Sequence, residues 1–375
     1  MSKLYVVFCM DTEGPCDDPG NDELLKDWKK VDFAMDKLFS REFRYKFKDS
    51  LGNNFKIGWF FLTWTGFKTN PRNRDFGYHK VRDHYRNRWG KQLISYGDEE
   101  CWHYHHPPKS GIGNEWSDDW SSSSEYKNII SRQIIERSWF PVCFRAGGTI
   151  MDANLSQWVD EWFPFDYSNR APLKFPEMDW SDGIEDWQPY TPDPINFKTK
   201  GKGKRKMARC MDLLTGTSVL KDEDILSAFE EALSNGKAII SVFDHDYRDI
   251  ETRVLDFLGK LNTINKKFKD VDLEYMSPSE AIAKYTNRLR DDGLKLELET
   301  LSDRYKISVN KDIHQKRPWL ATEDEDGNFE QLEKGLKIVS DRTWELPFED
   351  IKVVKKIGIA VSNASRETDI LLLQN

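Results

Sequence analysis

The sequence contains no apolar run near the roughly 18 residues that a helix needs to cross a bilayer. It opens with Met1-Ser2-Lys3 and the short apolar run Leu4–Phe8, which is shorter than the roughly 7–15 residues of a signal-peptide core. Basic residues are not in excess either, because 56 lysines and arginines stand against 64 aspartates and glutamates. These absences predict a cytoplasmic protein with no membrane span and no broad basic surface for nucleic acid.

Cysteine is scarce as well. The chain has five cysteines, and no Cys-x-x-Cys pair is among them. This odd and scattered set gives no sign of a disulfide framework. Most of these residues lie in or beside apolar runs, where a free thiol behaves as a small hydrophobic group. We therefore expect reduced thiols at Cys9, Cys16, Cys101, Cys143 and Cys210.

Aromatic residues, in contrast, are abundant. They form 13% of the chain and include 14 tryptophans. Such an excess of flat rings suits a ligand with flat apolar faces, sugars among them, but a large hydrophobic core also holds tryptophan. Composition alone leaves both interpretations open.

Short β-branched or aromatic runs alternate with longer stretches of helical spacing over residues 1–290. This order predicts a mostly parallel α/β sheet, and eight strand candidates are enough to close into a barrel. Strands are expected at Lys3–Met10, Ile57–Thr63, Glu99–His103, Pro141–Arg145, Phe163–Asp166, Lys206–Leu213, Ala238–Phe243 and Val271–Met276. Helices are expected at Asp22–Phe47, Val81–Ser95, Ser124–Trp139, Asp152–Phe163, Lys221–Asn235, Asp249–Phe268 and Pro278–Arg290, with Asp22 and Ser124 as candidate caps.

The pattern changes at Asp291-Asp292-Gly293. Beyond this junction the runs are short, several of them alternate, and turn-rich segments separate them. We therefore expect a second domain over residues 293–375, a small antiparallel β unit. Its strands are expected at Lys295–Glu299, Tyr305–Val309, Leu336–Val339, Thr343–Leu346, Ile357–Val361 and Ile370–Leu373.

Polar side chains follow the expected strands at their C-terminal ends. In a parallel barrel all of these ends meet one face, so residues more than two hundred positions apart would surround a single cleft. The residues concerned are Asp11, Glu13, His103, His105, His106, Arg145, Asp166, Asp244, His245 and Asp246.

Three of the seven histidines lie within four positions. In an extended segment, residues i and i+2 share a face, so His103 and His105 can present their rings to one metal ion. His106 points away unless the chain turns at Pro107-Pro108. Two imidazoles and one carboxylate leave open positions on a metal, as hydrolytic zinc and non-haem iron sites require. The alternative is a set of buried, hydrogen-bonded histidines in an aromatic loop.

Two further segments carry charge where a site would need it. Asp11-Thr12-Glu13-Gly14-Pro15 places carboxylates after an apolar strand, although an aspartate there can also cap or turn the chain. Arg145-Ala146-Gly147-Gly148 places a permanent cation beside backbone that can approach closely, and suits either an oxyanion or a structural ion pair. A third, basic segment, Lys198–Lys206, is either a solvated loop or a lid over an anion.

Five motifs follow one another along the chain: Asp11-Thr12-Glu13-Gly14-Pro15, Glu99-Glu100-Cys101-Trp102-His103 with its histidine-rich loop, Arg145, Asp166-Tyr167-Ser168, and His245. Together they resemble the polysaccharide deacetylase superfamily (NodB homology, carbohydrate esterase family 4), and especially its branch with an Asp-x-Glu first motif. The resemblance covers residues 3–285. It implies a distorted (β/α) barrel of seven or eight units. It also implies hydrolysis of N-acetyl groups on amino sugars with a divalent metal, first of all zinc, with iron, cobalt, nickel or manganese as alternatives.

By position, the resemblance implies roles for the site residues. Asp11 resembles the general base, Arg145 the arginine that orients it, and His245 the general acid. The expected metal ligands are Glu13, His103 and His105, with His106 as the rival of His105. Substrate contacts are expected at Trp102, Tyr104, Asp166 and Gly147, while Trp102, Tyr104, Trp116 and Trp120 can either stack on a sugar or simply pack the loop.

The chain departs from the family pattern at three positions. Thr12 separates two carboxylates that are usually adjacent, so Asp11 and Glu13 could exchange roles. Pro107 stands where the family has its second histidine. Gly147-Gly148 replaces the usual Pro-Tyr, which removes a tyrosine and widens the cleft.

The leading hypothesis is therefore a metal-dependent deacetylase that acts on an acetylated amino sugar, free or linked to a nucleotide or lipid, in polysaccharide or glycoconjugate metabolism. A second hypothesis is an amidase for a non-sugar C–N bond. A third is a carbohydrate-binding protein whose catalytic site has decayed.

Overall fold

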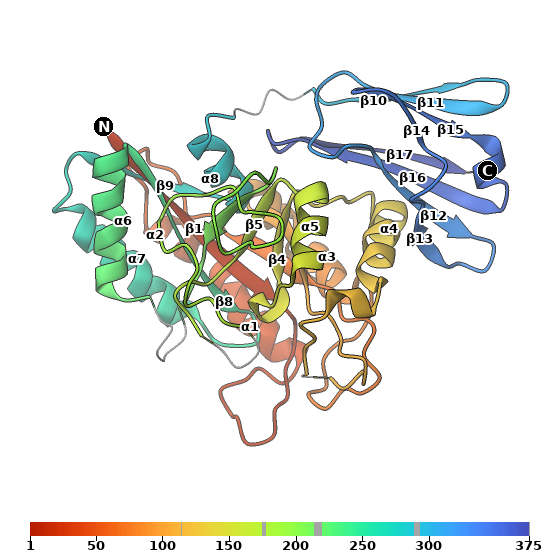
Figure 1. The fold of residues 1–375 in the computed structure, drawn as a ribbon. Helices are drawn as coiled ribbons and strands as arrows, with labels where there is room; N and C mark the ends of the chain where they lie inside the picture. Colours follow the sequence, from red (N-terminus) through yellow and green to blue (C-terminus); the bar gives the residue numbers. More distant parts are fainter. Residues whose placement is uncertain (114, 175–177, 214–219, 289–292, 375) are drawn as a thin grey trace.

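The computed structural model describes residues 1–113, 115–174, 178–213, 220–288 and 293–374, and it has two parts (Figure 1). The first is a parallel β barrel covered by helices, and the second is a pair of antiparallel sheets. The expected α/β barrel with a small C-terminal β unit is confirmed. The barrel strands are β1 (Ser2–Thr12), β2 (Gly58–Leu62), β3 (Glu99–Tyr104), β4 (Cys143–Ala146), β5 (Phe165–Asn169), β6 (Lys206–Arg209), β7 (Met211–Asp212), β8 (Lys237–His245) and β9 (Val271–Met276).

The barrel strands run in the order β6-β5-β4-β3-β2-β1-β8-β7, and every neighbouring pair is parallel. Only Cys210 separates β6, which pairs with β5, from β7, which pairs with β8. This bent segment nearly closes the ring. β9 pairs with the N-terminal half of β1, while β2 pairs with the C-terminal half. The C-terminal ends of the ring strands therefore share one face of the barrel.

The helices cover the outside of this barrel, but the first one differs from expectation. The stretch expected as one helix from Asp22 is two helices, and Asp27 caps the first of them by accepting a hydrogen bond from the Lys30 amide. Ser40 breaks the run because its side chain caps the second helix. Ser124 precedes its helix without a capping hydrogen bond. The helices are α1 (Trp28–Phe39), α2 (Arg41–Lys46), α3 (Lys80–Tyr96), α4 (Glu125–Arg137), α5 (Ala153–Trp162), α6 (Asp222–Asn235), α7 (Glu251–Asn265) and α8 (Pro278–Tyr285).

Strand alternation decides which side chains enter the barrel. Tyr5, Val7 and Cys9 of β1 belong to the interior core, whereas Leu4, Val6 and Phe8 pack against the helix layer. α8 contributes Ala281, Ile282 and Ala283 to the interior core. Four cysteines lie in this interior, all buried and without a disulfide, and a polar residue follows each of them two positions later. The pairs are Cys9 and Asp11, Cys101 and His103, Cys143 and Arg145, and Cys210 and Asp212.

The C-terminal part consists of two four-stranded antiparallel sheets, in the orders β10-β11-β15-β14 and β13-β12-β16-β17. They share an apolar core and lie beside α4 (Figure 1). The six expected strands are present, whereas Asp291 and Asp292 of the expected junction lie outside the described residues. The strands are β10 (Leu296–Thr300), β11 (Arg304–Val309), β12 (Trp319–Asp324), β13 (Phe329–Gln331), β14 (Lys337–Ser340), β15 (Thr343–Pro347), β16 (Val354–Ser362) and β17 (Thr368–Gln374).

β12 was not expected from the sequence because both of its faces are buried. Trp319 and Ala321 pack into the core beneath α4 and α5, while Leu320 packs into the core between the two C-terminal sheets. A strand buried on both faces has no alternation of apolar and polar residues. None of the described helices combines the length and the apolar character that crossing a bilayer requires.

A buried ion pair joins the helix layer to the barrel. The guanidinium of Arg44 donates to both carboxylate oxygens of Asp98, at 2.8 and 2.6 Å, and to the carbonyls of Leu38 and Phe55. Neither side chain of the pair is exposed. Asp98 also accepts hydrogen bonds from the Ile57 amide and the Trp59 indole. The pair therefore fixes α2 against the starts of β2 and β3.

We expect the Arg44→Met variant to lose about 3–5 kcal/mol of unfolding free energy, because it leaves a buried carboxylate without its counter-ion. Urea denaturation measures this loss. The matched control is Arg88→Met, since Arg88 forms an exposed pair with Asp36 and such pairs contribute about 0–1 kcal/mol. Equal losses in the two variants would contradict a structural role for the Arg44 pair.

Candidate metal centre

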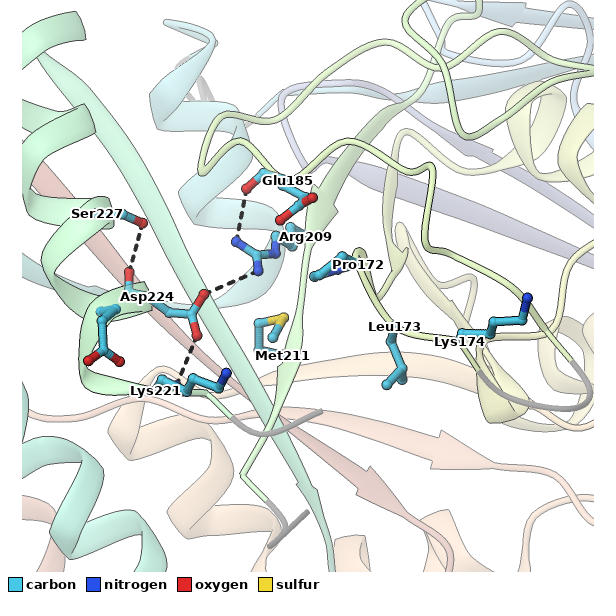
Figure 2. A pocket seen from close by; sticks show the side chains of 10 residues that line it. Pro172, Leu173, Lys174, Glu185, Arg209, Met211, Lys221, Asp224 and Ser227 are labelled. Atoms are coloured by element: carbon cyan, nitrogen blue, oxygen red, sulfur yellow. Dashed lines mark hydrogen bonds and ion pairs between the residues drawn. The ribbon is translucent and has the colours of Figure 1, made fainter. Parts of the chain in front are cut away.

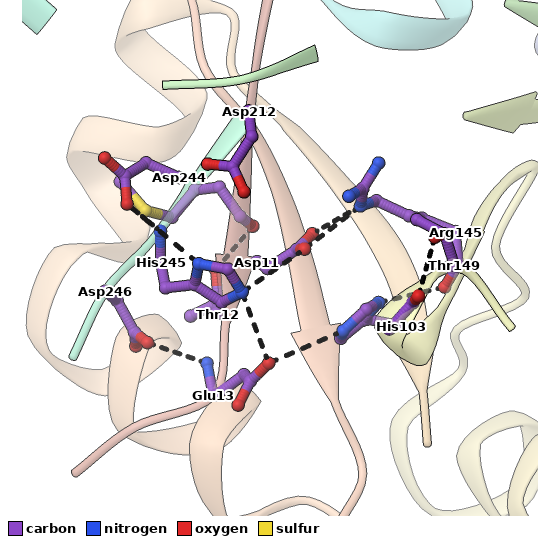
Figure 3. Close-up of polar contacts among 12 residues, drawn as sticks. Asp11, Thr12, Glu13, His103, Arg145, Thr149, Asp212, Asp244, His245 and Asp246 are labelled. Atoms are coloured by element: carbon purple, nitrogen blue, oxygen red, sulfur yellow. Dashed lines mark hydrogen bonds and ion pairs between the residues drawn. The ribbon is translucent and has the colours of Figure 1, made fainter. Parts of the chain in front are cut away.

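Five polar side chains from four strand ends meet at the C-terminal face of the barrel (Figure 3). β1 contributes Asp11 and is followed directly by Glu13, while β3 contributes His103. Arg145 comes from β4 and His245 from the end of β8. The register places Asp11 beside His245 and His103 beside Arg145. The structure thus brings together residues as far apart in the sequence as positions 11 and 245.

Glu13, His103 and His105 form a compact group of possible metal ligands. One ligand atom from each lies within 4.8 Å of the other two, and all three residues are buried. The Oε1 atom of Glu13 is 3.7 Å from His103 Nε2 and 3.3 Å from His105 Nε2. Among the described residues this is the group of histidines, cysteines and carboxylates that could hold an ion.

The hydrogen bonding of His103 indicates that this group suits a cation. Its Nδ1 atom is 2.9 Å from the carbonyl oxygen of Arg145, which can only accept, so Nδ1 carries the ring proton. Nε2 has no hydrogen-bond partner, and it faces the Glu13 carboxylate 3.7 Å away. A divalent cation between this nitrogen and the carboxylate would satisfy both groups. A backbone carbonyl that fixes the far nitrogen is also the usual arrangement of a metal-binding histidine.

Asp11 is held by Arg145. The Nε atom of Arg145 lies 3.0 Å from both oxygens of the carboxylate, and its Nη1 donates to the Tyr167 carbonyl. Burial raises the pKa of the Asp11 carboxyl, but the charge of Arg145, with the imidazoles of His103 and His245 close by, leaves the pKa below its usual value. Asp11 is therefore ionised at neutral pH. Its Oδ1 atom has no hydrogen-bond partner.

His245 closes the group from the side of β8. Its Nε2 atom is 3.8 Å from Asp11 Oδ2 and 3.9 Å from Glu13 Oε1. Its Nδ1 atom lies 3.3 Å from Nη1 of Arg248. Burial lowers the pKa of His245 to about 3; the carboxylates of Glu13 and Asp11 oppose this effect and Arg248 adds to it. The imidazole is therefore neutral at neutral pH, with one nitrogen directed at the two carboxylates.

Arg74 completes the surroundings of Glu13 and was not among the residues expected at the site. Its Nη2 atom is 3.1 Å from Glu13 Oε2, and its guanidinium lies against the rings of Trp64 and Tyr247. Burial raises the pKa of Glu13, but Arg74 and the two histidines hold it well below its usual value. Arg74 lies in the loop between β2 and α3, well past the end of the strand, so a search limited to residues at strand ends does not find it.

His105 and not His106 lies in the ligand group. The His105 ring stacks on Trp64 at 5.7 Å and contacts Trp116 at 4.1 Å between ring centroids. His106 packs against Trp120 and Tyr126, and its Nε2 lies 3.4 Å from the Ser123 carbonyl. Of the two candidates, His105 therefore has the geometry of a ligand.

Gly147 lies directly against the ring of His105. A Cβ atom at this position would come within 2.4 Å of His105 Cγ, and Trp64 and Trp116 leave the ring little room to move. We therefore expect the Gly147→Ala variant to displace His105 and to bind a divalent metal about 10–100-fold more weakly, as changes next to metal ligands do.

Isothermal titration with Zn²⁺ measures this effect. The matched control is Gly90→Ala on α3, where no atom lies within 4 Å of the added methyl group. This control is expected to keep wild-type affinity. Wild-type affinity in Gly147→Ala would show that the ring of His105 does not need its present position.

Three of the expected substrate contacts do not reach this group. Trp102 and Tyr104 point to the other face of β3, where they are fully buried in the core beneath α4 and α5 and expose no ring to a sugar. Asp166 is buried in an ion pair with Arg205 and accepts hydrogen bonds from Ser168. The side chains of Trp102 and Tyr104 and that of Asp166 thus lie on strand faces that motif order does not specify. Trp120 is buried as well, whereas Trp116 is partly exposed beside His105.

The basic segment Lys198–Lys206 forms ion pairs with neighbouring loops. Lys198 pairs with Asp182 and Lys200 with Asp186. Arg205 is fully buried and bonds to Asp166 and Ser156. Because Lys198, Lys200 and Arg205 are paired with carboxylates of the protein, their charges are already balanced and do not call for a bound anion.

A separate cavity of about 830 Å³ lies between β6, β7 and the start of α6 (Figure 2). Its lining mixes the cations of Lys174, Arg209 and Lys221 with carboxylates such as Asp224. Arg209 donates to the carbonyls of Ala171 and Glu185 and to Asp224. None of the metal-centre residues lines this cavity, so we assign it no part in the chemistry.

Three solved structures are similar to this chain over 76% of its length. One, from Mycobacterium smegmatis and described as a polysaccharide deacetylase, is 12% identical, is covered over 91% of its chain and has a TM-score of 0.43. A second, described as a polysaccharide deacetylase from Pseudomonas aeruginosa PAO1, is 12% identical, is covered over 92% and has a TM-score of 0.43. The third, Puue allantoinase, is 13% identical, is covered over 90% and has a TM-score of 0.44.

Two of these structures are described as polysaccharide deacetylases. No family model matches the sequence, and no curated protein is similar to it.

Proposed function

We propose that this protein is a metal-dependent hydrolase that removes the acetyl group from the nitrogen of an amino sugar. The observation that carries the proposal is the unpartnered Nε2 of His103, which faces the Glu13 carboxylate 3.7 Å away, with His105 beside them. Glu13, His103 and His105 would hold the metal, and zinc suits this mixture of imidazole and carboxylate; iron, cobalt, nickel or manganese are the alternatives. When bound, the ion polarises the acetyl carbonyl and lowers the pKa of an attacking water.

Asp11 is the general base of this proposal. It is ionised and buried, and its Oδ1 atom accepts no hydrogen bond, so this oxygen can accept a proton from water. Arg145 orients the carboxylate by a hydrogen bond to Oδ2 and an ion-pair contact with Oδ1, both at 3.0 Å. The oxygen of the water then forms the new bond to the acetyl carbon.

His245 delivers a proton to the leaving nitrogen. The C–N bond can break only when the nitrogen gains a proton, because a free amide anion is a very poor leaving group. The resting imidazole is neutral, and because the Arg248 guanidinium can only donate to Nδ1, Nε2 carries the ring proton. The ring would give this Nε2 proton to the leaving nitrogen, and the proton that Asp11 takes from water would replace it across the 3.8 Å between Asp11 Oδ2 and Nε2. The products are acetate and a free amine.

The barrel, residues 1–290, carries this chemistry, and residues 293–375 form an accessory domain. Trp116 is partly exposed and packs on the His105 ring, so its free face can stack on a sugar ring at the site. An acetylated amino sugar, free or linked to a nucleotide or lipid, is the substrate class that fits an aromatic wall next to an amide-hydrolysing centre.

The test combines metal analysis with a substrate panel. The purified protein is expected to contain about one divalent ion per chain. Acetate release is then compared between oligomers of N-acetylglucosamine, a nucleotide-linked N-acetylhexosamine and two non-sugar compounds, a simple acetamide and a cyclic ureide. Release from sugars alone supports the proposal, whereas turnover of the non-sugar compounds alone would indicate an amidase of another class. Absence of both metal and turnover would favour a carbohydrate-binding protein.

A further inference from the structure

Asp246 holds the turn that carries Glu13. It follows the last residue of β8 and is fully buried. Its Oδ1 accepts hydrogen bonds from the amides of Glu13 at 2.8 Å and Gly14 at 3.1 Å, and its Oδ2 accepts from the Gly14 amide at 3.0 Å. Its own amide lies 3.3 Å from the Asp11 carbonyl and donates to it. One residue thus contacts the backbone on both sides of the Asp11–Glu13 segment (Figure 3).

Among the described residues, Asp246 is the acceptor recorded for the Glu13 and Gly14 amides, while the Trp64 indole donates to the Glu13 carbonyl at 3.2 Å. β1 ends at Thr12, and its last ladder partners are Phe61 of β2 and, one residue earlier, His245 of β8. The amides of Glu13 and Gly14 therefore lie beyond the last paired residue of β1, where the chain is still buried but has no strand partner. A buried amide without an acceptor costs about 1–3 kcal/mol, so the Asp246 carboxylate fixes the path of the chain here.

Asp246 is in turn fixed by Tyr85 of α3. The Tyr85 hydroxyl donates to Asp246 Oδ2 at 2.8 Å, and its ring packs among Trp59, Phe61 and Trp89 in the helix-side core. The Trp28 ring lies so close to Gly14 that an added Cβ atom would be 3.0 Å from it. The backbone of Glu13 is therefore anchored to the rigid layer between β2 and α3.

We propose that Asp246 is a positioning residue for the metal centre: it sets the place of the Glu13 carboxylate relative to His103 and His105. The proposal rests on the proposed function, because it takes Glu13 as a ligand. Arg74 holds only one oxygen of Glu13 from outside, so the distance from Oε1 to the two imidazoles depends on where the backbone of Glu13 lies. A carboxylate with two acceptor oxygens is needed at position 246, because three hydrogen-bond donors converge on it.

The test measures Co²⁺ binding by the visible absorption of the bound ion, which does not require a substrate. Asp246→Asn turns an amide NH₂ toward amide and hydroxyl donors, so we expect its Co²⁺ affinity to fall about 10–100-fold, the usual effect of changing a residue that orients a ligand. Tyr85→Phe keeps the ring and removes one donor, and should weaken binding in the same direction but less.

The control for general destabilisation is Asp166→Asn, which changes another buried carboxylate of the barrel, on β5, that does not contact the turn of Glu13 and Gly14. It is expected to lower the melting temperature and to leave the Co²⁺ affinity unchanged. If Asp246→Asn and Tyr85→Phe keep wild-type affinity while the wild type binds Co²⁺, Asp246 is merely structural and the inference fails. If Asp246→Asn does not fold, the affinity of Tyr85→Phe decides the question. A wild type that binds no Co²⁺ would refute the proposed metal centre itself, and this inference with it.

Discussion

The His103→Ala variant is expected to lose stoichiometric metal and acetate release together. The Nε2 atom of His103 has no hydrogen-bond partner and faces the Glu13 carboxylate, and the backbone carbonyl of Arg145 fixes the orientation of the ring. Without His103 two ligands remain, and two ligands bind a divalent ion too weakly for it to stay bound during dialysis. Elemental analysis of the dialysed protein measures the metal, and an acetate assay measures turnover.

The matched control for this variant is His106→Ala. His106 belongs to the same loop and is equally buried, but its ring packs against Trp120 and Tyr126 instead of the ligand group. It should keep its metal even if some stability is lost. A His103→Ala protein with a full complement of metal and wild-type turnover would refute the assignment of the site.

Asp11→Asn is expected to lower turnover by about 10²–10⁴-fold while the metal stays bound. The amide of asparagine keeps the shape of the side chain but cannot accept a proton from water at neutral pH. Asp11 is not in the group of close ligand atoms, so metal content should not change. Steady-state rates and elemental analysis on the same preparation separate the two effects.

The complementary variant is Glu13→Gln. Its main expected effect is loss of bound metal. The sequence left open whether these two carboxylates exchange roles, because Thr12 stands between them. In the structure Glu13 lies next to the histidines and Asp11 next to Arg145. If Asp11→Asn loses its metal and Glu13→Gln retains it, the roles are reversed.

Much of the barrel could be predicted because its strands are short apolar runs between helices of regular spacing. The ends of β1, β3, β4 and β8 could be located for the same reason, and with them Asp11, His103, Arg145 and His245. The break between α1 and α2 was missed because Ser40 resembles any polar residue on a helix surface until its side chain is seen to cap the second helix.

Residues whose role depends on a distant partner could not be predicted. Arg74 contacts Glu13 from a loop. Asp246 accepts a hydrogen bond from the Glu13 amide, which has no strand partner because β1 ends one residue earlier. Trp102 and Tyr104 were expected at the site because they are next to His103 in the sequence. Adjacent residues of a strand point to opposite faces, however, so these two side chains point away from His103.

The sequence by itself determined the alternation of strands and helices in the barrel and the change to short strand patterns near residue 290. It also determined which strand ends carry carboxylates, imidazoles and a guanidinium. These features are local, since they follow from the periodicity of apolar residues and from chain order. Only the tertiary structure decided that His105 rather than His106 joins the ligand group, and that Glu13 is held by Arg74 and Asp246. The physical reason is that hydrogen bonds and ion pairs between distant segments act over a few ångströms, and chain order does not specify such distances.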